Sequence, residues 1–551
     1  MIVSGYDVER ELTSEARLFA QKVARSIIEI ESNVNNIADV VVLLDVLGYN
    51  KEQVMKYGFD DLFDLAKYIY DFVDAYEDRG KSKEDYIKTF TIPIDGLSHR
   101  IAESIGLLFP WLGSLVLLFL TGVSLWMAWG LPQQISTALV VGVFLGLVIS
   151  EGLVQIFAKL FTFYHEQTNI GEMKRLLKKQ YLLSSIILTC TVGGLYGYSI
   201  FSHIPFELVT ISSIATVTIS LHRISYMIIF ALKKLVHLIF AYSAAFATII
   251  SIFFMASSLI SDTTFRYFVA LGSAFAILTV FAVYHNLKTM SIKPSSKVIS
   301  LDAPHFYKPR ALTDKTLRSK FTVQLWESLP NFLFGIFYFV VMFSDRVISW
   351  SYNTLKVNGI VLPMGFNSVY HMGADLALSV LIPASVIQYV MTVPIFKQLN
   401  NMSVIYKVPE IDKIYQFIQK IYRKVVTVTI LASVIAALAI NFVIPQIPAY
   451  HGVSQDSMSI LHIASIGNVL LSIFSANGMF AMLLNRVKPL AIMTMISAIV
   501  VSVGGIVLGK FGLEYITLSY LASAALLAIC STFYVKKIFK NAPSIFFARY
   551  I

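Results

Sequence analysis

Hydrophobic segments long enough to cross a lipid bilayer recur along the chain from about residue 104 to residue 535. A helix needs roughly 20 predominantly apolar residues to span the hydrocarbon core. The segments are separated by polar connectors, so the pattern predicts twelve membrane-spanning helices and an all-α polytopic membrane protein. The predicted spans cover residues 104–129, 135–160, 181–201, 205–232, 236–260, 264–286, 327–350, 371–396, 421–446, 458–485, 488–510 and 514–535.

The first hundred residues follow a different pattern. Apolar residues from Leu18 to Ile30 recur at helical spacing among charged ones, as in an amphipathic helix. The apolar run 40–47 is too short to span a bilayer, and Gly48 after it suits a helix C-terminus. Two more helices are predicted over residues 51–57 and 60–76. This part of the chain is therefore predicted to be a cytosolic helical region.

Basic residues are concentrated in every second connector between the predicted spans. The intervening connectors hold almost only Arg266, Lys356 and Lys510. Cytoplasmic loops of membrane proteins carry the excess of lysine and arginine. We therefore predict a multi-pass protein of the cytoplasmic (plasma) membrane whose N- and C-termini are both cytoplasmic.

The longest and most basic connector follows the sixth predicted span and divides the membrane part into two halves. Halves with an even number of spans are related as parallel repeats about an axis along the membrane normal. The predicted organisation has four parts. They are a cytosolic helical region over 1–100, a first six-helix bundle over 101–290, a basic cytoplasmic connector over 291–325, and a second six-helix bundle with a short basic tail over 326–551.

Composition agrees with a membrane protein. The 551 residues are 56% hydrophobic and 14% charged, whereas a soluble protein carries about 25% charged residues. Residues 1–100 have a net charge of −7 and residues 101–551 one of +17. In a membrane protein such a basic excess marks cytoplasmic loops, so we expect no nucleic-acid partner. Cys190 and Cys530 lie in apolar segments and predict neither a disulfide framework nor a metal site.

The sequence contains no enzyme motif. The phosphate-binding Gly-x-x-x-x-Gly-Lys-Ser/Thr loop, His-Glu-x-x-His, Gly-x-Ser-x-Gly and a dinucleotide-binding Gly-x-Gly-x-x-Gly are all missing. We therefore predict no catalytic residue, no cofactor and no metal, and we expect that the chain itself does not hydrolyse ATP.

Polar and charged residues inside the predicted spans are the candidates for a functional site, because a charge near hydrocarbon is costly unless it is paired or hydrated. The candidates for substrate binding or gating are Glu151, Gln155, Arg223, Asp345, Arg346, Asp375, His462 and Asn477. The predicted topology places them in two layers. Asp345, Arg346, Asp375 and His462 fall toward the outer ends of their spans, and the other four fall in the inner halves.

Oppositely charged groups on different helices are expected to form an outer and an inner latch of a cleft. For several candidates a plainer interpretation is open. Asp345, Arg346 and Arg223 can reach water at the interface by extending their side chains. The lone histidines can serve helix packing. Glu151 is the hardest to explain in this way, since it lies well inside its span.

One stretch resembles a known family. Its first part reads IFYFVVMFSDRVISWSYN, followed by a Gly/Pro-containing connector and then FNSVYHMGADLALSVLIPASVI. The pair Asp345–Arg346 with Trp350, the Asn-x-Val-Tyr sequence beginning at Asn367, and Ile-Pro at Pro383 resemble PelG-like proteins of the MOP (multidrug/oligosaccharidyl-lipid/polysaccharide) flippase superfamily. The resemblance implies a MATE-like pair of six-helix bundles and a carrier that moves a polysaccharide or lipid-linked glycan across the membrane. It assigns no role to individual residues.

Two other functions remain open from the sequence. The chain can be an ion-coupled exporter of small amphipathic cations, with Glu151 as the binding acid. It can also be a membrane scaffold without transport activity. Residues 1–100 would then recruit a cytosolic glycosyltransferase or regulatory partner. For a glycan carrier, the expected partners are membrane lipid and a glycan or lipid-linked glycan substrate.

Overall fold

The computed structural model forms two compact units. The N-terminal unit comprises residues 1–94 together with 396–417, and the membrane unit comprises residues 95–395 and 418–551. The structure describes residues 14–30, 37–49, 51–77, 96–121, 131–166, 170–232, 235–255, 260–291, 321–357, 360–362, 364–405, 411–446 and 454–540.

Four helices make up most of the described N-terminal unit. They are α1 (Ser14–Ile30), α2 (Ile37–Val46), α3 (Lys51–Met55) and α4 (Leu62–Glu77). Apolar side chains from all four, among them Ile27, Leu44 and Leu65, are buried in one core. Gly48 and Gly58, which follow α2 and α3, have φ of +82° and +90°. Glycine adopts this left-handed conformation without steric cost, which explains where these helices end.

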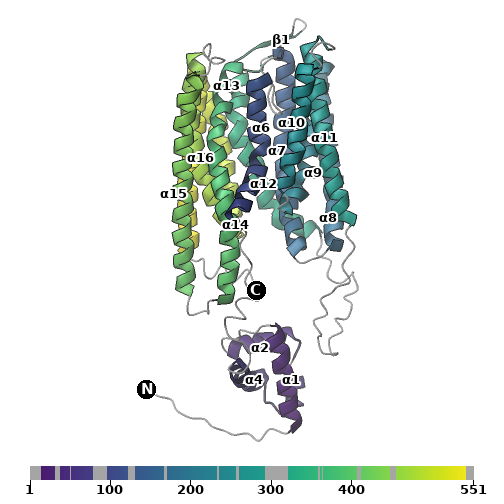
Figure 1. The fold of residues 1–551 in the computed structure, drawn as a ribbon, viewed down its shortest axis with the longest axis vertical. Helices are drawn as coiled ribbons and strands as arrows, with labels where there is room; N and C mark the ends of the chain where they lie inside the picture. Colours follow the sequence, from purple (N-terminus) through teal and green to yellow (C-terminus); the bar gives the residue numbers. More distant parts are fainter. Residues whose placement is uncertain are drawn as a thin grey trace. The chain divides into compact units, whose positions relative to one another are not determined.

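The membrane unit contains the predicted spans. Twelve helices among the described residues are long and apolar enough to cross a membrane, which confirms the predicted fold class. Figure 1 shows them side by side, with a short hairpin at one end, here called the hairpin end. The elements are α6 (Leu97–Thr121), α7 (Gln133–Glu166), α8 (Ile170–Ser202), α9 (Phe206–Ala231), α10 (Val236–Met255), α11 (Thr263–Ser291), α12 (Phe321–Trp350), β1 (Leu355–Val357), β2 (Ile360–Leu362), α13 (Ser368–Ala377), η2 (Leu378–Val380), α14 (Leu381–Ile405), α15 (Ile411–Val443), η4 (Ile444–Gln446), α16 (Gln455–Leu483), α17 (Lys488–Leu508), η6 (Gly509–Phe511) and α18 (Leu513–Lys540).

The helices pack in two groups. In the first group α7 packs on α9, and α10 packs on α6 and α11. In the second group α12 packs on α17, α13 on α16, and α18 on α16 and α17. Contact between α7 and α12 joins the groups, which we call the first and second bundle. The bundle boundaries given by the sequence stay a prediction, and most of the 291–325 connector lies outside the described residues.

The eighth span is broken rather than continuous. Helix α13 ends at Ala377, a 3₁₀ turn follows, and α14 begins at Leu381. Pro383 explains the break, because proline lacks an N–H and its ring crowds the carbonyl four residues earlier. The tighter turn at Leu378–Val380 accommodates that carbonyl. As a result, Asp375 lies just before a change in backbone geometry.

A row of hydroxyl groups binds α9 to α7. Ser212, Thr216 and Ser220 each donate to an α7 carbonyl, at 2.7, 3.1 and 3.2 Å. The acceptors belong to Ala138, Gly142 and Gly146, and the absence of side chains at the two glycines lets the helices approach closely. Close packing over small residues, combined with interhelical hydrogen bonds, is how helices associate in lipid.

The contact between α7 and α12 also depends on glycine. A Cβ added at Gly152 of α7 would lie 2.7 Å from the Phe332 ring, and one at Gly335 of α12 would lie 3.1 Å from the Glu151 carbonyl oxygen. Both glycines lie near the middle of their helices. The bundles therefore approach each other closely next to Glu151.

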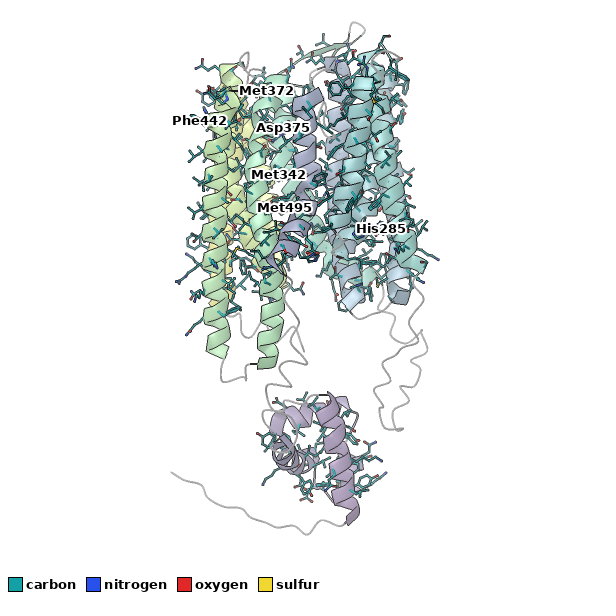
Figure 2. All side chains as sticks on the ribbon, viewed as in Figure 1. His285, Met342, Met372, Asp375, Phe442 and Met495 are labelled. Carbon is teal, nitrogen blue, oxygen red and sulfur yellow. The ribbon has the colours of Figure 1, made fainter. Side chains whose placement is uncertain are left out.

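Large apolar side chains cover the outside of the membrane unit. Helix α15 presents Leu431, Ile435, Leu438 and Phe442 at intervals of three or four residues, all well exposed. Figure 2 labels Phe442, which points away from the neighbouring helices. Such an apolar stripe suits contact with lipid, where exposed hydrocarbon is not penalised as it is in water.

Candidate functional site

A buried charge network connects α12 and α13 near the hairpin end. Arg346 donates from Nε to Asp375 Oδ1 at 2.6 Å and from Nη1 to Asp345 Oδ1 at 3.0 Å. Its Nη1 and Nη2 also reach the backbone carbonyls of Met342 and Ala374. Only 3% of the Arg346 side chain and none of the Asp345 side chain is exposed. Almost all hydrogen bonds of the Arg346 guanidinium thus go to groups of its own bundle.

The network continues through three side chains with aromatic rings. His371, one turn before Asp375 on α13, has Nδ1 at 2.8 Å from Asp375 Oδ2. Trp350, the last residue of α12, donates from its indole nitrogen to His371 Nε2 at 2.9 Å. The Tyr370 hydroxyl donates to Asp345 Oδ2 at 2.8 Å. Two carboxylates, one guanidinium and one imidazole are therefore held in fixed orientations.

The second charged pair lies in the first bundle. Arg223 of α9 forms an ion pair with Glu151 of α7, and Gln155 donates to the other Glu151 oxygen at 2.7 Å. The guanidinium carbon lies 5.2 Å from the centre of the Phe339 ring. Arg223 Nε is buried and has no hydrogen-bond partner among the described residues. A quarter of the side chain is exposed and Arg223 lines the cavity described next, so its exposed guanidinium nitrogens, rather than Nε, can meet a ligand.

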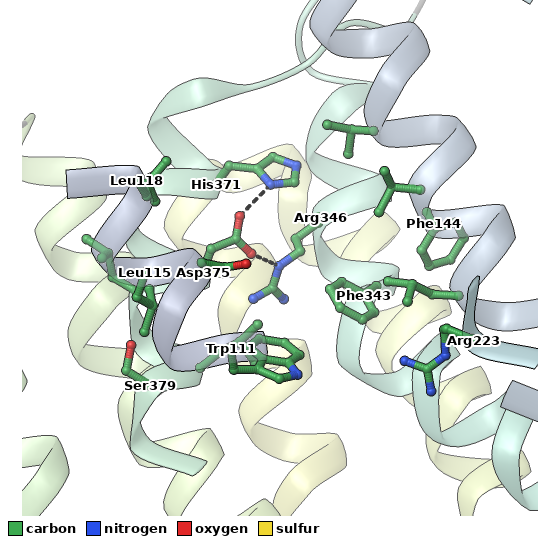
Figure 3. A pocket seen from close by; sticks show the side chains of 16 residues that line it. Trp111, Leu115, Leu118, Phe144, Arg223, Phe343, Arg346, His371, Asp375 and Ser379 are labelled. Carbon is green, nitrogen blue, oxygen red and sulfur yellow. Dashed lines mark hydrogen bonds and ion pairs between the residues drawn. The ribbon is translucent and has the colours of Figure 1, made fainter. Parts of the chain in front are cut away.

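A cavity lies between the two bundles and reaches both charged groups. Its volume is about 920 Å³, including the part open to solvent. Ten of its sixteen lining residues are apolar, and Figure 3 shows Asp375 between His371 and Arg346, with Arg223 on the far side of Phe343. The lining residues are Trp111, Ser114, Leu115, Leu118, Val140, Val143, Phe144, Leu147, Arg223, Phe343, Arg346, His371, Asp375, Leu376, Leu378 and Ser379.

Several contacts join the bundles away from the hairpin end. Tyr389 of α14 donates to Glu103 of α6 at 3.1 Å, and Arg100 Nη1 donates to the Val390 carbonyl at 2.9 Å. Gln324 of α12 donates to the Tyr164 hydroxyl of α7. On α6, α7 and α12, the residues that line the cavity lie closer to the hairpin end than these contacts do. The contacts therefore close the cavity toward the end of the bundles opposite the hairpin.

The sequence predicts latches between oppositely charged groups on different helices. The structure does pair Glu151 with Arg223, and Asp375 with Arg346, in each case across two helices. Each pair nevertheless lies within one bundle, because α7 and α9 belong to the first and α12 and α13 to the second. The pairs face the shared cavity rather than bridging the bundles.

Two other candidates lie away from this cavity. His462 is exposed on α16. Asn477 is buried, accepts from the Tyr422 hydroxyl at 2.8 Å and donates to Ser531 and Thr532, both at 2.9 Å. These bonds join α16 to α15 and α18, so the contacts of Asn477 are those of a helix-packing residue.

Sequence reasoning did not select His371, Tyr370 or Trp111 as site residues. A signal for His371 was present, since a histidine four residues before Asp375 lies on the same helix face. No comparable signal marks Trp111, because aromatic residues are common throughout the spans. Its place in the cavity wall depends on how α6 packs between the bundles.

Comparisons with known proteins bear on the fold. No protein-family profile matches the sequence, and no curated protein is similar to it in sequence. An outward-facing MATE transporter of the MOP superfamily superimposes with a TM-score of 0.54 at 14% identity, covering 84% of this chain and 97% of that one. The chain has the MATE fold. A MOP superfamily transporter from Pyrococcus furiosus, described as having a binding pocket of reverse polarity that suggests a different function, gives 0.54 at 13% identity with the same coverage.

The MATE transporter ClbM, solved in complex with Rb⁺, has a TM-score of 0.52 at 10% identity and covers 79% of this chain and 94% of that one. The MOP-type architecture predicted from the sequence is thus confirmed at the level of the MATE fold. Likeness at this identity shows the fold alone and does not separate polysaccharide flippases from small-molecule exporters. The PelG-like subtype stays a prediction.

Proposed function

We propose that this chain is a membrane transporter that moves a polysaccharide or lipid-linked glycan across the cytoplasmic membrane by alternating access between its two bundles. The observation that carries the proposal is the cavity between the bundles, which combines apolar walls with the partly exposed guanidinium of Arg223. Ligand pockets are mostly apolar and use a few polar groups to orient the ligand. In a lipid-linked glycan, an anionic phosphate would match the guanidinium, and an apolar chain would match the apolar walls.

The two arginines of the cavity differ in what they can bind. Arg346 is flanked by Asp345 and Asp375 and donates to two carbonyls, so it has little left for a ligand. Arg223 has one carboxylate partner, lines the cavity and has a quarter of its side chain exposed. Guanidinium groups bind phosphate oxygens through parallel hydrogen bonds. Arg223 is therefore the phosphate-binding residue of this proposal.

The alternative substrate class, small amphipathic cations, requires a carboxylate that is free to bind them. Both candidate acids already have cationic partners. Asp375 accepts from Arg346 and His371, and Glu151 accepts from Arg223 and Gln155. The Glu151–Arg223 pair is electrically balanced, so the part of the cavity next to Arg223 does not favour a cationic substrate.

Reconstituted vesicles test the proposal. A fluorescent lipid-linked oligosaccharide diphosphate is incorporated, and its movement between leaflets is followed with a membrane-impermeant quencher. We expect the protein to accelerate this movement and Arg223→Ala to slow it by roughly tenfold or more, because a hydrogen bond to a charged group contributes about 1.5–3 kcal/mol.

Arg423→Ala serves as the matched control, since Arg423 is exposed on α15 outside the cavity. It should transport at the normal rate. Equal rates for Arg223→Ala and the control would refute the role of Arg223. Transport of a small cationic dye in place of the glycan lipid would favour the exporter alternative.

A further inference from the structure

The hydrogen bonds of His371 fix its protonation state. An indole nitrogen only donates, so His371 Nε2 must accept the bond from Trp350 at 2.9 Å. The hydrogen of a neutral imidazole then lies on Nδ1, which donates to Asp375 Oδ2 at 2.8 Å. The network thus assigns the tautomer, and His371 is neutral in this structure.

Around a neutral His371 the charges do not balance. Asp345 and Asp375 carry two negative charges, and Arg346 carries one positive charge. The other titratable groups that face this cluster are the hydroxyls of Tyr370 on α13 and Tyr520 on α18, with Arg223 across the cavity. The cavity-lining side chains of α6 and α7 are uncharged. One excess negative charge therefore remains in a buried cluster that a proton from the cavity can reach.

Protonation of His371 would break its bond to Trp350. A second hydrogen, on Nε2, would point at the indole N–H, and two donors cannot form a hydrogen bond at 2.9 Å. The bond to Asp375 would remain and gain strength, because both partners would be charged. The side chain displaced by the proton is thus Trp350.

Trp350 belongs to the contact between the bundles at the hairpin end. It is buried with Phe366 and with Val140 of α7. The Phe366 ring lies 4.6 Å from the His371 ring. The Phe366 N–H donates to Thr137 Oγ1 of α7 at 2.9 Å. Residues bonded to His371 or packed on its ring therefore contact the first bundle directly.

We propose that His371 and Trp350 form a proton-operated latch: a proton on His371 releases Trp350 and loosens the contact between α12 and α7 at the hairpin end. The inference deepens the proposed function, because it makes access to the same cavity depend on pH. Loss of the hydrogen bond between Trp350 and His371 is the step that changes the contact between the bundles. Protonation is favoured because it neutralises the excess negative charge of the cluster.

Distances between spin labels at the hairpin end test the latch. Phe206→Cys on α9 and Phe511→Cys on η6 place one label on an exposed position of each bundle, with Cys190 and Cys530 replaced by serine. The full-length protein is measured in lipid nanodiscs between pH 5 and 8, the range in which histidine normally titrates. We expect a shift toward longer distances as the pH falls, and no shift in His371→Gln.

Trp350→Phe removes the bond that the proton is proposed to break. The contact should then already be released at pH 8, so we expect long distances and no shift between pH 8 and pH 5. Trp111→Phe is the matched control, because it makes the same change in the wall of the same cavity, and its pH response should equal that of the parent protein.

A pH response that persists in His371→Gln or in Trp350→Phe would overturn the latch. So would the absence of any pH response in the parent protein. Because these distances are measured without substrate, their failure is independent of failure of the glycan-lipid transport assay.

Discussion

Arginine occurs twice in the cavity wall and is used in two ways. Arg346 is enclosed by acids and carbonyls of α12 and α13, whereas Arg223 faces the cavity with one acid beside it. Removing one partner of a buried ion pair leaves an uncompensated charge, which is more costly than losing a surface pair. Substitutions around Arg346 should therefore affect mainly stability, and those around Arg223 mainly substrate handling.

Glu151→Gln tests this distinction in the first bundle. The amide cannot neutralise Arg223, so the guanidinium is left with a full uncompensated charge for a substrate phosphate. We expect the apparent KM for a lipid-linked oligosaccharide to fall several-fold in the vesicle assay. A higher KM would contradict the assignment of Glu151 as a competitor for the phosphate site.

Arg346→Gln tests the second bundle. The Arg346 guanidinium is buried and forms ion pairs with both Asp345 and Asp375. Its removal leaves two buried carboxylates without this counter-charge, which costs about 3–5 kcal/mol, so the thermal unfolding midpoint in detergent should fall clearly. Arg423→Gln is the control, because Arg423 is exposed on α15 outside the cavity. Equal midpoints for the two variants would refute the prediction.

At the residue scale the sequence identifies costly groups but not their partners. Glu151, Arg223, Asp345, Arg346 and Asp375 stand out because charge is rare in apolar spans. Their pairing depends on which helices adjoin, and a single sequence holds no record of contacts between distant spans. The helix-packing role of Asn477 could likewise not be predicted from the sequence, since its partners lie on α15 and α18.

Among the elements, α7 and α9 form the closest pair in the first bundle. Three hydroxyl–carbonyl bonds, four residues apart along each helix, hold them in register. This register also fixes Arg223 opposite Glu151, one or two turns beyond the last of these bonds. The geometry of the substrate site thus depends on backbone packing far from any charge.

Gly142→Ala should disturb that register. The added methyl would lie 2.3 Å from the Ser212 carbonyl oxygen, so α7 and α9 must separate. Overpacking of this kind costs about 1–3 kcal/mol. Gly193→Ala in α8 makes the same change where nothing lies within 4 Å, and it should be neutral or slightly stabilising. Thermal unfolding of both variants in detergent checks the prediction, which fails if they unfold at the same temperature.

The spans could be predicted from hydrophobicity because length and apolar composition decide them. Their ends were less predictable. Helix α8 starts at Ile170 although its apolar part begins near residue 181, because the basic turns before it continue the helix. The break at Leu378–Val380 is implied by Pro383, yet many membrane helices accommodate proline without a 3₁₀ turn.

For the whole molecule, the MATE fold follows from the membrane unit alone. Deleting residues 1–94 removes α1 to α4 and leaves the cavity and both charge networks. If the chain is a carrier, the truncated protein should retain a measurable part of its transport rate in vesicles. Absence of transport in both the full-length and the truncated protein, each inserted and unfolding cooperatively, would favour the scaffold alternative.

The close approach of α7 and α12 has a geometric consequence. Gly152 lies against Phe332, and Gly335 lies against Glu151. Each glycine divides its helix into two arms of roughly equal length, about 20–28 Å at 1.5 Å per residue. A tilt of one bundle by about 15° about this point, the size of rotation seen between subunits in allosteric proteins, would move the two ends by roughly 5–7 Å in opposite directions. In the proposed alternating access this contact would be the pivot, so that widening at the hairpin end and narrowing at the other would be one motion.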